Sequence, residues 1–353
     1  MSLRRIGIAS LAAVALVAAS MIGLTGAASG ASTDANSAAG LHVSGSTANQ
    51  RVLVTFPVDD WGQFAESMVA DHDGNLFVSV TAWKGEGWNK GQVWKITPRG
   101  IVTKYGPELD VGMITGLALD EHGRLYAGLS TWGDPSYPPG VLRIDASGSS
   151  RVLALPSGDW GIAAMPNGLA FRGETLYVSD STHGAIWRTR PHGNVNDVQS
   201  EPWIQNALLA PSVGWEGING IAIDATGIEA VVADVGLVVR IPIMRNGAPG
   251  TPRILASDPA LVNADGVTFA RDGSLWVVTN GGAAFTGSIV KVSPRGHVTV
   301  VVQDPGWLDY PSQPVFGTTH ATEDTLYIAN GGLNNSPGSA NVIAWHVDID
   351  AHH

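Results

Sequence analysis

The sequence predicts an all-β protein: a six-bladed β-propeller with four antiparallel strands in each blade, preceded by a signal peptide. Three observations lead to this prediction. A degenerate unit recurs six times, apolar and polar residues alternate with a period of two inside the units, and the chain begins with an apolar run. The 44 glycines and 20 prolines also suit short strands joined by turns. A β-sandwich with accidental internal similarity is the alternative.

Residues 1–31 are predicted to form the signal peptide. Arg4 and Arg5 provide the positive start, a nearly uncharged apolar run follows, and small residues close the segment, with cleavage expected after Ala28 or Ala31. An uncleaved membrane anchor is the alternative, because the apolar run approaches the length of a membrane span. Cleavage leaves no stable membrane anchor, so we expect a secreted, extracellular protein.

The rest of the chain divides into a short linker and one domain. Residues 32–48 are rich in Ala, Ser, Gly and Asn and have little to bury, so we expect a flexible linker. Residues 49–350 contain all the repeated units and are predicted to form the propeller. The repeats carry no signal for an oligomeric state.

Charge and cysteine content exclude several classes of function. The formal net charge is −11, and without the signal segment 18 basic residues face 31 acidic ones, a net charge of −13. Such a surface repels a phosphate backbone, so we expect no nucleic-acid partner. Because cysteine is absent, the chain has no disulfide, no thiolate nucleophile, no cysteine-bound metal and no lipoprotein anchor.

Each repeat starts with a polar residue, often followed by Gly, and continues with an apolar alternation, a polar turn and an aromatic-centred strand. Consecutive starts are 49, 52, 52 and 46 residues apart, which matches four short strands and therefore a propeller blade. The starting residues of the first five copies are Glu66, Thr115, Asn167, Asn219 and Asp265. The sixth copy is degenerate and aligns in two ways, with either Gln313 or Phe316 in the starting position.

Residues 51–55 form an additional apolar strand ahead of blade one. We expect this strand to pair with residues 342–347 in blade six, because that pairing closes the ring and removes two exposed strand edges. Both ends of the domain would then complete the same blade.

The starting residues of the repeats are expected to meet in space. The innermost strand of every propeller blade begins near the central axis, so equivalent positions converge although they lie far apart in the sequence. All five carry a side-chain oxygen, and a group with two carboxylates and two amides needs a compensating cation. Oxygen ligands favour Ca²⁺, or another divalent cation of similar preference, over zinc or copper. The alternative is that Asn-Gly and Asp-Gly are ordinary turn residues, which leaves Glu66 unexplained.

This order of starting residues resembles the senescence marker protein/gluconolactonase/luciferin-regenerating enzyme superfamily. The resemblance extends over about residues 50–350 and includes the segments Pro166–Phe171 and Tyr177–Asp180. Related members are calcium-dependent phosphotriesterases and lactonases. The resemblance implies that a catalytic divalent cation is bound by Glu66, Asn167, Asn219 and Asp265. It further implies that Asp265, together with Glu66, is catalytic, with Asp265 acting as the base or the nucleophile.

The function expected from this site is metal-dependent hydrolysis, most directly of lactones or related esters. A bound cation polarises a carbonyl or phosphoryl oxygen, and a neighbouring carboxylate activates water or attacks directly. A non-catalytic propeller that binds a ligand or a cell-wall polymer is the first alternative, because the fold alone does not establish catalysis. A strictosidine-synthase-like or lyase activity is the second.

The loops that lead into the inner strands are rich in tryptophan. An apolar wall around the cation indicates a small-molecule substrate, a lactone or ester with an apolar body. We expect this pocket to include Thr115, Trp61, Trp160 and Trp215, with Trp307 in a loop of the same kind. The alternative is that the tryptophans pack between blades. His183 is a candidate proton donor to a leaving group, and the alternative is a solvent-exposed loop histidine.

Overall fold

The computed structural model describes residues 49–56, 62–83, 88–110, 112–131, 137–157, 163–191, 201–214, 216–281, 286–333 and 340–349. The predicted signal peptide, residues 1–31, and the predicted linker, residues 32–48, lie outside these ranges. Within the described ranges, no helix is long and apolar enough to cross a membrane.

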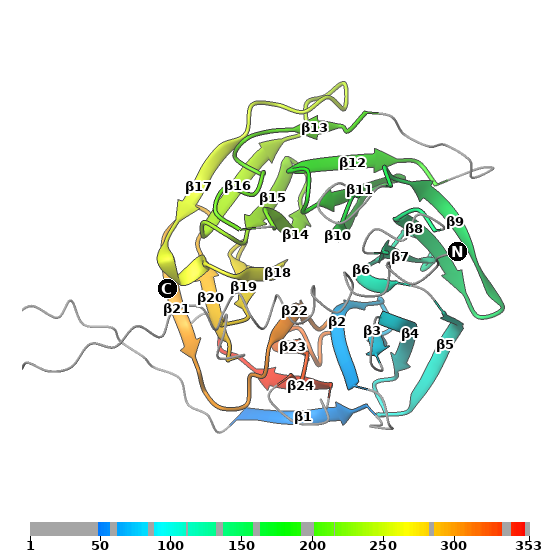
Figure 1. Cartoon of the computed structure of the whole chain (residues 1–353). Helices are drawn as coiled ribbons and strands as arrows, with labels where there is room; N and C mark the ends of the chain where they lie inside the picture. The colour runs from blue at the N-terminus through cyan, green and yellow to red at the C-terminus, as the bar shows by residue number, and fades with distance from the viewer. Residues whose placement is uncertain are drawn as a thin grey trace, which may run out of the picture.

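The described residues form six four-stranded antiparallel sheets around a central axis (Figure 1). The predicted six-bladed propeller is therefore confirmed, and the first strand of each blade lies innermost. Blades one and two contain β2 (Gly62–Ala70), β3 (Leu76–Trp83), β4 (Trp88–Ile96), β5 (Val102–Leu109), β6 (Met113–Leu119), β7 (Leu125–Ser130), β8 (Gly140–Asp145) and β9 (Gly148–Ala154). Blades three and four contain β10 (Pro166–Arg172), β11 (Thr175–Asp180), β12 (Ala185–Thr189), β13 (Ile204–Gln205), β14 (Ile218–Ile223), β15 (Gly227–Val232), β16 (Leu237–Pro242) and β17 (Arg253–Ser257).

The ring closes through strands from both ends of the domain. Blade five contains β18 (Ala264–Phe269), β19 (Leu275–Thr279), β20 (Ser288–Val292) and β21 (Val298–Gln303), and the short 3₁₀ helix η2 (Pro259–Leu261) precedes it. Blade six combines β22 (Pro311–Phe316), β23 (Thr325–Asn330) and β24 (Asn341–His346) with the N-terminal strand β1 (Gln50–Thr55). Because β1 pairs antiparallel with β24, the predicted closure is confirmed.

The apolar core is distributed over the interfaces between blades. Six clusters of buried residues each join two neighbouring sheets, as expected when every sheet buries both faces against its neighbours. Between blades five and six, the fully buried Trp276 packs edge-on against Trp345, with ring centroids 6.2 Å apart. Trp307 packs against the same Trp345 at 5.8 Å, so this tryptophan belongs to the packing between blades.

A β-bulge interrupts the inner strand of every blade at its starting residue. In blade two, Ile114 pairs with Leu129 and Gly116 pairs with Gly128, which leaves Thr115 as the extra residue. The pairing of the first two strands slips at the corresponding place in the other five blades. A bulge redirects a side chain and ends regular pairing. The five starting residues predicted from the repeat therefore reach one common space, described below.

The register of blade six corrects the sequence alignment. Pro311 pairs with Asn330 and Gln313 pairs with Ala329, so the extra residue is Ser312. The starting residue is therefore neither Gln313 nor Phe316. Gln313 occupies the position that is glycine in blades two to five, and the missing glycine removed the sequence signal. Phe316 lies at the far end of β22, where its ring packs on Trp276 at 5.6 Å.

The glycine that follows the starting residue allows neighbouring inner strands to approach each other. A Cβ atom on Gly116 would lie 1.9 Å from the backbone oxygen of Asn167 in the next blade. The same relation recurs for Gly220 and the backbone oxygen of Asp265, at 2.5 Å. A side chain cannot be accommodated there without moving a starting residue of the adjacent blade.

Gly116→Ala is therefore expected to lower the free energy of unfolding by about 3 kcal/mol, the upper part of the usual range for overpacking. The added methyl group would overlap a backbone atom, which cannot rotate away. Denaturant unfolding followed by tryptophan fluorescence measures the loss. Gly148→Ala is the matched control, because a Cβ atom there meets nothing within 4 Å. Equal losses in both variants would contradict the close approach of the blades.

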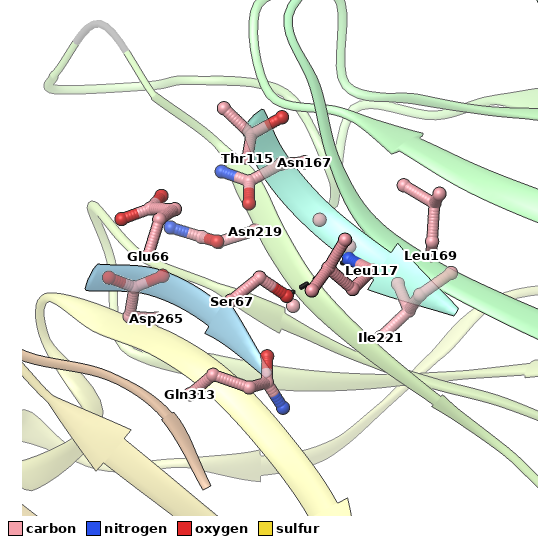
Figure 2. Close-up of a pocket in the computed structure, with 13 residues that line it drawn as sticks. Glu66, Ser67, Thr115, Leu117, Asn167, Leu169, Asn219, Ile221, Asp265 and Gln313 are labelled. Carbon is pink, nitrogen blue, oxygen red and sulfur yellow. Dashed lines mark hydrogen bonds between the residues drawn. The ribbon is translucent and has the colours of Figure 1, made fainter. Parts of the chain in front are cut away.

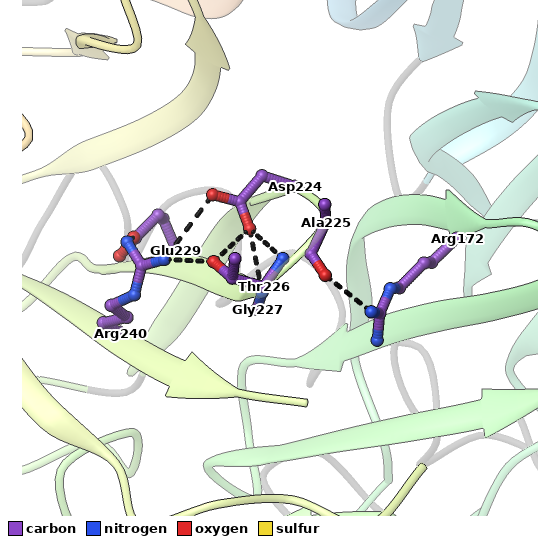
Figure 3. A network of polar contacts seen from close by, with 7 residues as sticks. All are labelled: Arg172, Asp224, Ala225, Thr226, Gly227, Glu229 and Arg240. Atoms are coloured by element: carbon purple, nitrogen blue, oxygen red, sulfur yellow. Dashed lines mark hydrogen bonds and ion pairs between the residues drawn. The ribbon is translucent and has the colours of Figure 1, made fainter. Parts of the chain in front are cut away.

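A polar network links blades three and four at the far ends of their inner strands (Figure 3). Arg172 donates to the backbone oxygen of Ala225 at 2.6 Å, and Arg240 contacts Glu229, Asp224 and Thr226. Asp224 lies five positions after Asn219, the starting residue carried by β14, which corresponds to roughly 16 Å along a strand. This network therefore joins blades at a distance from the starting residues.

Candidate functional site

The predicted starting residues converge on a small chamber near the propeller axis (Figure 2). The chamber has a volume of about 40 Å³ and is lined by Glu66, Thr115, Asn167, Asn219 and Asp265. All five side chains are buried, the most exposed being Glu66 at 8%. This volume accommodates an ion with a few waters, since one water needs about 10–15 Å³, but not a lactone. A substrate would therefore have to place only its reacting group at the mouth of the chamber.

Apolar side chains and one amide form the other wall of the chamber. Leu117, Leu169 and Ile221 come from the second half of the same inner strands, and Gln313 completes the wall (Figure 2). These four residues also line a larger cavity of about 510 Å³ toward the far ends of the strands. They therefore separate the chamber with its carboxylates from a mainly apolar cavity on the opposite side.

The two hydroxyl-bearing starting residues connect blades to one another. The Thr115 hydroxyl donates to the backbone oxygen of Pro166 in blade three. The Ser312 hydroxyl donates to the backbone oxygen of Ala65 in blade one, at 2.7 Å. Because both hydroxyl protons are used between blades, Thr115 and Ser312 stabilise the ring beside the chamber. Thr115 is among the residues that line the chamber.

Glu216, which the sequence analysis did not identify, holds the two amides. Its Oε1 atom accepts hydrogen bonds from Nδ2 of Asn219 at 2.9 Å and from Nδ2 of Asn167 at 3.0 Å. Asn167 Nδ2 also lies 3.3 Å from the hydroxyl of the fully buried Ser181. Burial is the main cause that raises the pKa of Glu216 to about 7. The amides of blades three and four therefore share one carboxylate.

The two predicted carboxylates are buried close enough to repel each other. Burial, followed by repulsion from Asp265 and Glu216, raises the pKa of Glu66 well above its usual range. Burial and repulsion from Glu216 likewise raise the pKa of Asp265, against hydrogen bonds from Asn280 and Asn219. Asn280 Nδ2 donates to Asp265 Oδ2 at 3.1 Å. A positive charge in the chamber would relieve this repulsion.

The donor set fits a hard divalent cation. In the described part of the chain, acidic, histidine and cysteine side chains nowhere form a group of three or more arranged to hold a metal ion. A cation in the chamber would therefore need amide oxygens beside Glu66 and Asp265. Asn219 offers one, because its buried Oδ1 atom has no hydrogen-bond partner among the described residues. An unpaired buried oxygen beside carboxylates matches the oxygen ligands that Ca²⁺ prefers.

Solved structures with the same fold include an enzyme and a binding protein. Luciferin-regenerating enzyme has 15% sequence identity and a TM-score of 0.54, with 82% of this chain and 94% of that chain covered. A gluconolactonase candidate has 13% identity and a TM-score of 0.56, with coverages of 85% and 93%. An auxiliary nutrient binding protein from Bacteroides ovatus has 11% identity and a TM-score of 0.56, with coverages of 84% and 76%.

The chain has the luciferin-regenerating enzyme and gluconolactonase fold. The resemblance noted in the sequence is thus confirmed at the level of the fold. No family model and no curated protein matches the chain in sequence. The roles of individual residues in this propeller therefore rest on its own geometry.

Tyr310 is a second residue that sequence analysis did not identify. It precedes β22 and adopts a φ of 56°, a left-handed conformation that an aromatic residue rarely takes. The amide of Gly331 donates to its backbone oxygen at 2.9 Å, which supports this conformation. Burial, followed by Asp265, Glu216 and Glu66, raises the pKa of Tyr310 well above its usual value. The phenol therefore stays protonated near the three carboxylates, and backbone strain of this kind often occurs at functional sites.

His183 lies in the predicted loop of blade three, against a buried carboxylate. Its Nδ1 atom is 2.9 Å from Oδ2 of Asp180, which also accepts from Trp187 Nε1 at 2.9 Å. The His183 side chain is 30% exposed and is not among the residues that line the central chamber. Its role as a proton donor stays a prediction. Trp61, Trp160 and Trp215 lie outside the described residues.

Two signals in the sequence point to the residues that were not identified. Glu216 stands three positions before Asn219 and is an acidic residue in an otherwise weakly charged segment. Tyr310 stands two positions before Ser312, so it could be found only after the register of blade six was known. Both belong to segments that enter an inner strand of the propeller.

Proposed function

We propose that the protein is a secreted, metal-dependent hydrolase of lactones or related esters that uses a central Ca²⁺ ion. The observation that carries the proposal is the convergence of Glu66, Asn167, Asn219 and Asp265 on one buried chamber, where Asn219 Oδ1 lacks a partner. The apolar N-terminal run supports export, with cleavage after Ala28 or Ala31. The fold shared with a gluconolactonase candidate agrees with this chemistry.

The metal ligands in this proposal are Glu66, Asn167, Asn219 and Asp265. A bound Ca²⁺ ion supplies a Lewis acid that polarises the substrate carbonyl. Asp265 acts as the base that takes a proton from water or, alternatively, as the nucleophile that attacks the carbonyl carbon. Asn280 donates to Oδ2 of Asp265 and so fixes the orientation of this carboxylate. The protonated Tyr310 is a donor near the same carboxylates.

The size of the chamber constrains how a substrate binds. About 40 Å³ admits the reacting group at most, so the ring and side chain of a lactone must lie outside, among the loops that enter the inner strands. A small-molecule substrate with an apolar body suits this arrangement. On the opposite side, the chamber is closed by the wall of Leu117, Leu169, Ile221 and Gln313.

Chelation is the direct test of the proposed function. The mature protein is expected to hydrolyse members of a panel of lactones, aryl esters and organophosphates, to lose the activity after dialysis against a chelator, and to regain it with Ca²⁺. Metal content is measured in the same samples. Activity that survives complete removal of divalent cations would overturn metal-dependent hydrolysis. Tight ligand or cell-wall binding without turnover would instead favour the non-catalytic propeller, and metal-free elimination would favour a lyase.

A further inference from the structure

Glu216 occupies a bridging position between two blades. It precedes β14 of blade four by two residues, and its Oε1 atom accepts from Asn219 in blade four and from Asn167 in blade three. The two distances, 2.9 and 3.0 Å, are those of ordinary hydrogen bonds. One carboxylate oxygen therefore determines the orientation of two amides that lie 52 residues apart in the sequence.

In the hydrogen bonds between Glu216 and the two asparagines, the amide nitrogens are the donors and the carboxylate is the acceptor. An ionised carboxylate only accepts hydrogen bonds, whereas an amide has a donating nitrogen and an accepting oxygen of nearly equal size. Which end of an asparagine faces a given point is therefore decided by its hydrogen-bond partners. Because Glu216 attracts both nitrogens, the Oδ1 atoms of Asn167 and Asn219 are turned away from it. A reversed amide would present N–H groups to the chamber and repel a cation.

Neighbouring groups reinforce the same orientation. The hydroxyl of Ser181, fully buried at the end of the β11 segment, lies 3.3 Å from Asn167 Nδ2. The hydroxyl of Ser179 donates to the backbone oxygen of Asn219 at 2.6 Å, which fixes the main chain from which that amide extends. Asn219 Oδ1 is then left buried without a hydrogen-bond partner among the described residues. An oxygen held in this way is prepared for a cation.

We propose that Glu216 is a positioning residue that fixes Asn167 and Asn219 with their amide oxygens toward the bound cation. The inference rests on the proposed function, because it assumes that these two asparagines are metal ligands. Glu216 is not one of the four ligands in the proposed function. Glu216 acts through its acceptor oxygen, so its contribution differs from that of a charge that merely attracts the cation.

The unaltered protein and two variants of Glu216 separate the contribution of the acceptor oxygen from that of the negative charge. Glu216→Gln keeps an acceptor oxygen and removes the charge, whereas Glu216→Met keeps the length of the side chain and removes both. Ca²⁺ is titrated calorimetrically into the three metal-free proteins at one fixed pH. Glu216→Met is expected to weaken Ca²⁺ binding by about 10- to 100-fold, the usual cost of losing a group that orients a metal ligand. Glu216→Gln is expected to weaken it by less than about tenfold.

The possible outcomes separate the positioning role of Glu216 from the proposed function of the protein. Unchanged Ca²⁺ affinity in Glu216→Met, with binding by the unaltered protein, overturns the positioning role and leaves the proposed function intact. Equal losses in the Gln and Met variants also overturn it, because charge alone would then explain the effect. Failure of the unaltered protein to bind any divalent cation overturns the proposed function and the positioning role together. Thermal unfolding of the metal-free proteins shows whether each variant folds, and Glu216→Ala replaces the Met variant if that one does not.

Glu323→Gln is the matched control for charge. Glu323 lines the 510 Å³ cavity beyond the opposite wall of the chamber and pairs with His320 at 3.0 Å. Its substitution removes one negative charge from the wider cavity without touching the amides. The Ca²⁺ affinity of this variant is expected to equal that of the unaltered protein.

Discussion

Asp265→Asn is expected to lower kcat/KM for lactone hydrolysis by about 10³-fold, in the middle of the range for loss of general acid–base catalysis. Asparagine has the size of aspartate and retains an oxygen that can contact the cation. It cannot take a proton from water or attack a carbonyl as an anion. Asp265 lies in the β18 bulge, is buried and accepts a hydrogen bond from Asn280. Steady-state kinetics on the best substrate of the panel measures the loss.

Asp304→Asn is the matched control for this substitution. Asp304 is an exposed residue after β21 in the same blade, with a φ of 41° that asparagine also tolerates. The control is expected to keep full activity. Unchanged kcat/KM in Asp265→Asn would show that the reaction does not pass through this carboxylate, and the proposed mechanism would then be wrong.

Removal of the cation is expected to destabilise the protein, and more strongly as the pH rises. Burial raises the pKa of Glu216 to about 7 and that of Glu66 and Asp265 above their usual values. In the unfolded chain these groups ionise near pH 4.5 and 3.8. Between those values and pH 7, the folded metal-free protein binds more protons than the unfolded chain. Its free energy of unfolding therefore falls as the pH increases through this window.

Bound Ca²⁺ is expected to prevent this loss of stability with rising pH. A cation favours the ionised carboxylates, so the Ca²⁺-loaded protein should keep its stability above pH 7. Ca²⁺ at 100 times its dissociation constant should add about 2.7 kcal/mol to the free energy of unfolding. Thermal unfolding with chelator or with Ca²⁺, from pH 5 to pH 8, measures both effects. KCl at equal ionic strength controls for screening, and parallel curves in all conditions would contradict a cation site.

The fold was predictable because the repeat encodes it locally. Period-two alternation specifies strands, the recurring turn residues set their ends, and copies 46 to 52 residues long are sufficient for four strands. Five of the six starting residues could be read from the polar residue before an apolar alternation. Ser312 could not, because blade six has Gln313 where blades two to five have glycine, and the register of the bulge is decided by pairing with β23.

The candidate site was only partly predictable, because a repeat pattern gives equivalent positions but not the contacts between blades. Repeat alignment shows which starting residues converge, and all five identified from the sequence line the chamber. It cannot show the direction of a hydrogen bond between residues of different blades. The hydroxyl of Thr115, which donates to Pro166, and the carboxylate of Glu216, which holds Asn167 and Asn219, lie outside what a repeat pattern encodes.

The six blades, the closing strand and the convergence of Glu66, Asn167, Asn219 and Asp265 could all be predicted from the amino-acid pattern along the chain. The folded structure was needed to show that Ser312 completes the ring of starting residues and that Glu216 and Tyr310 lie beside the carboxylates. Glu216 and Tyr310 come from segments outside the repeat pattern, and the place of Ser312 is set by the pairing of β22 with β23. Their positions depend on packing between blades, which local sequence does not specify.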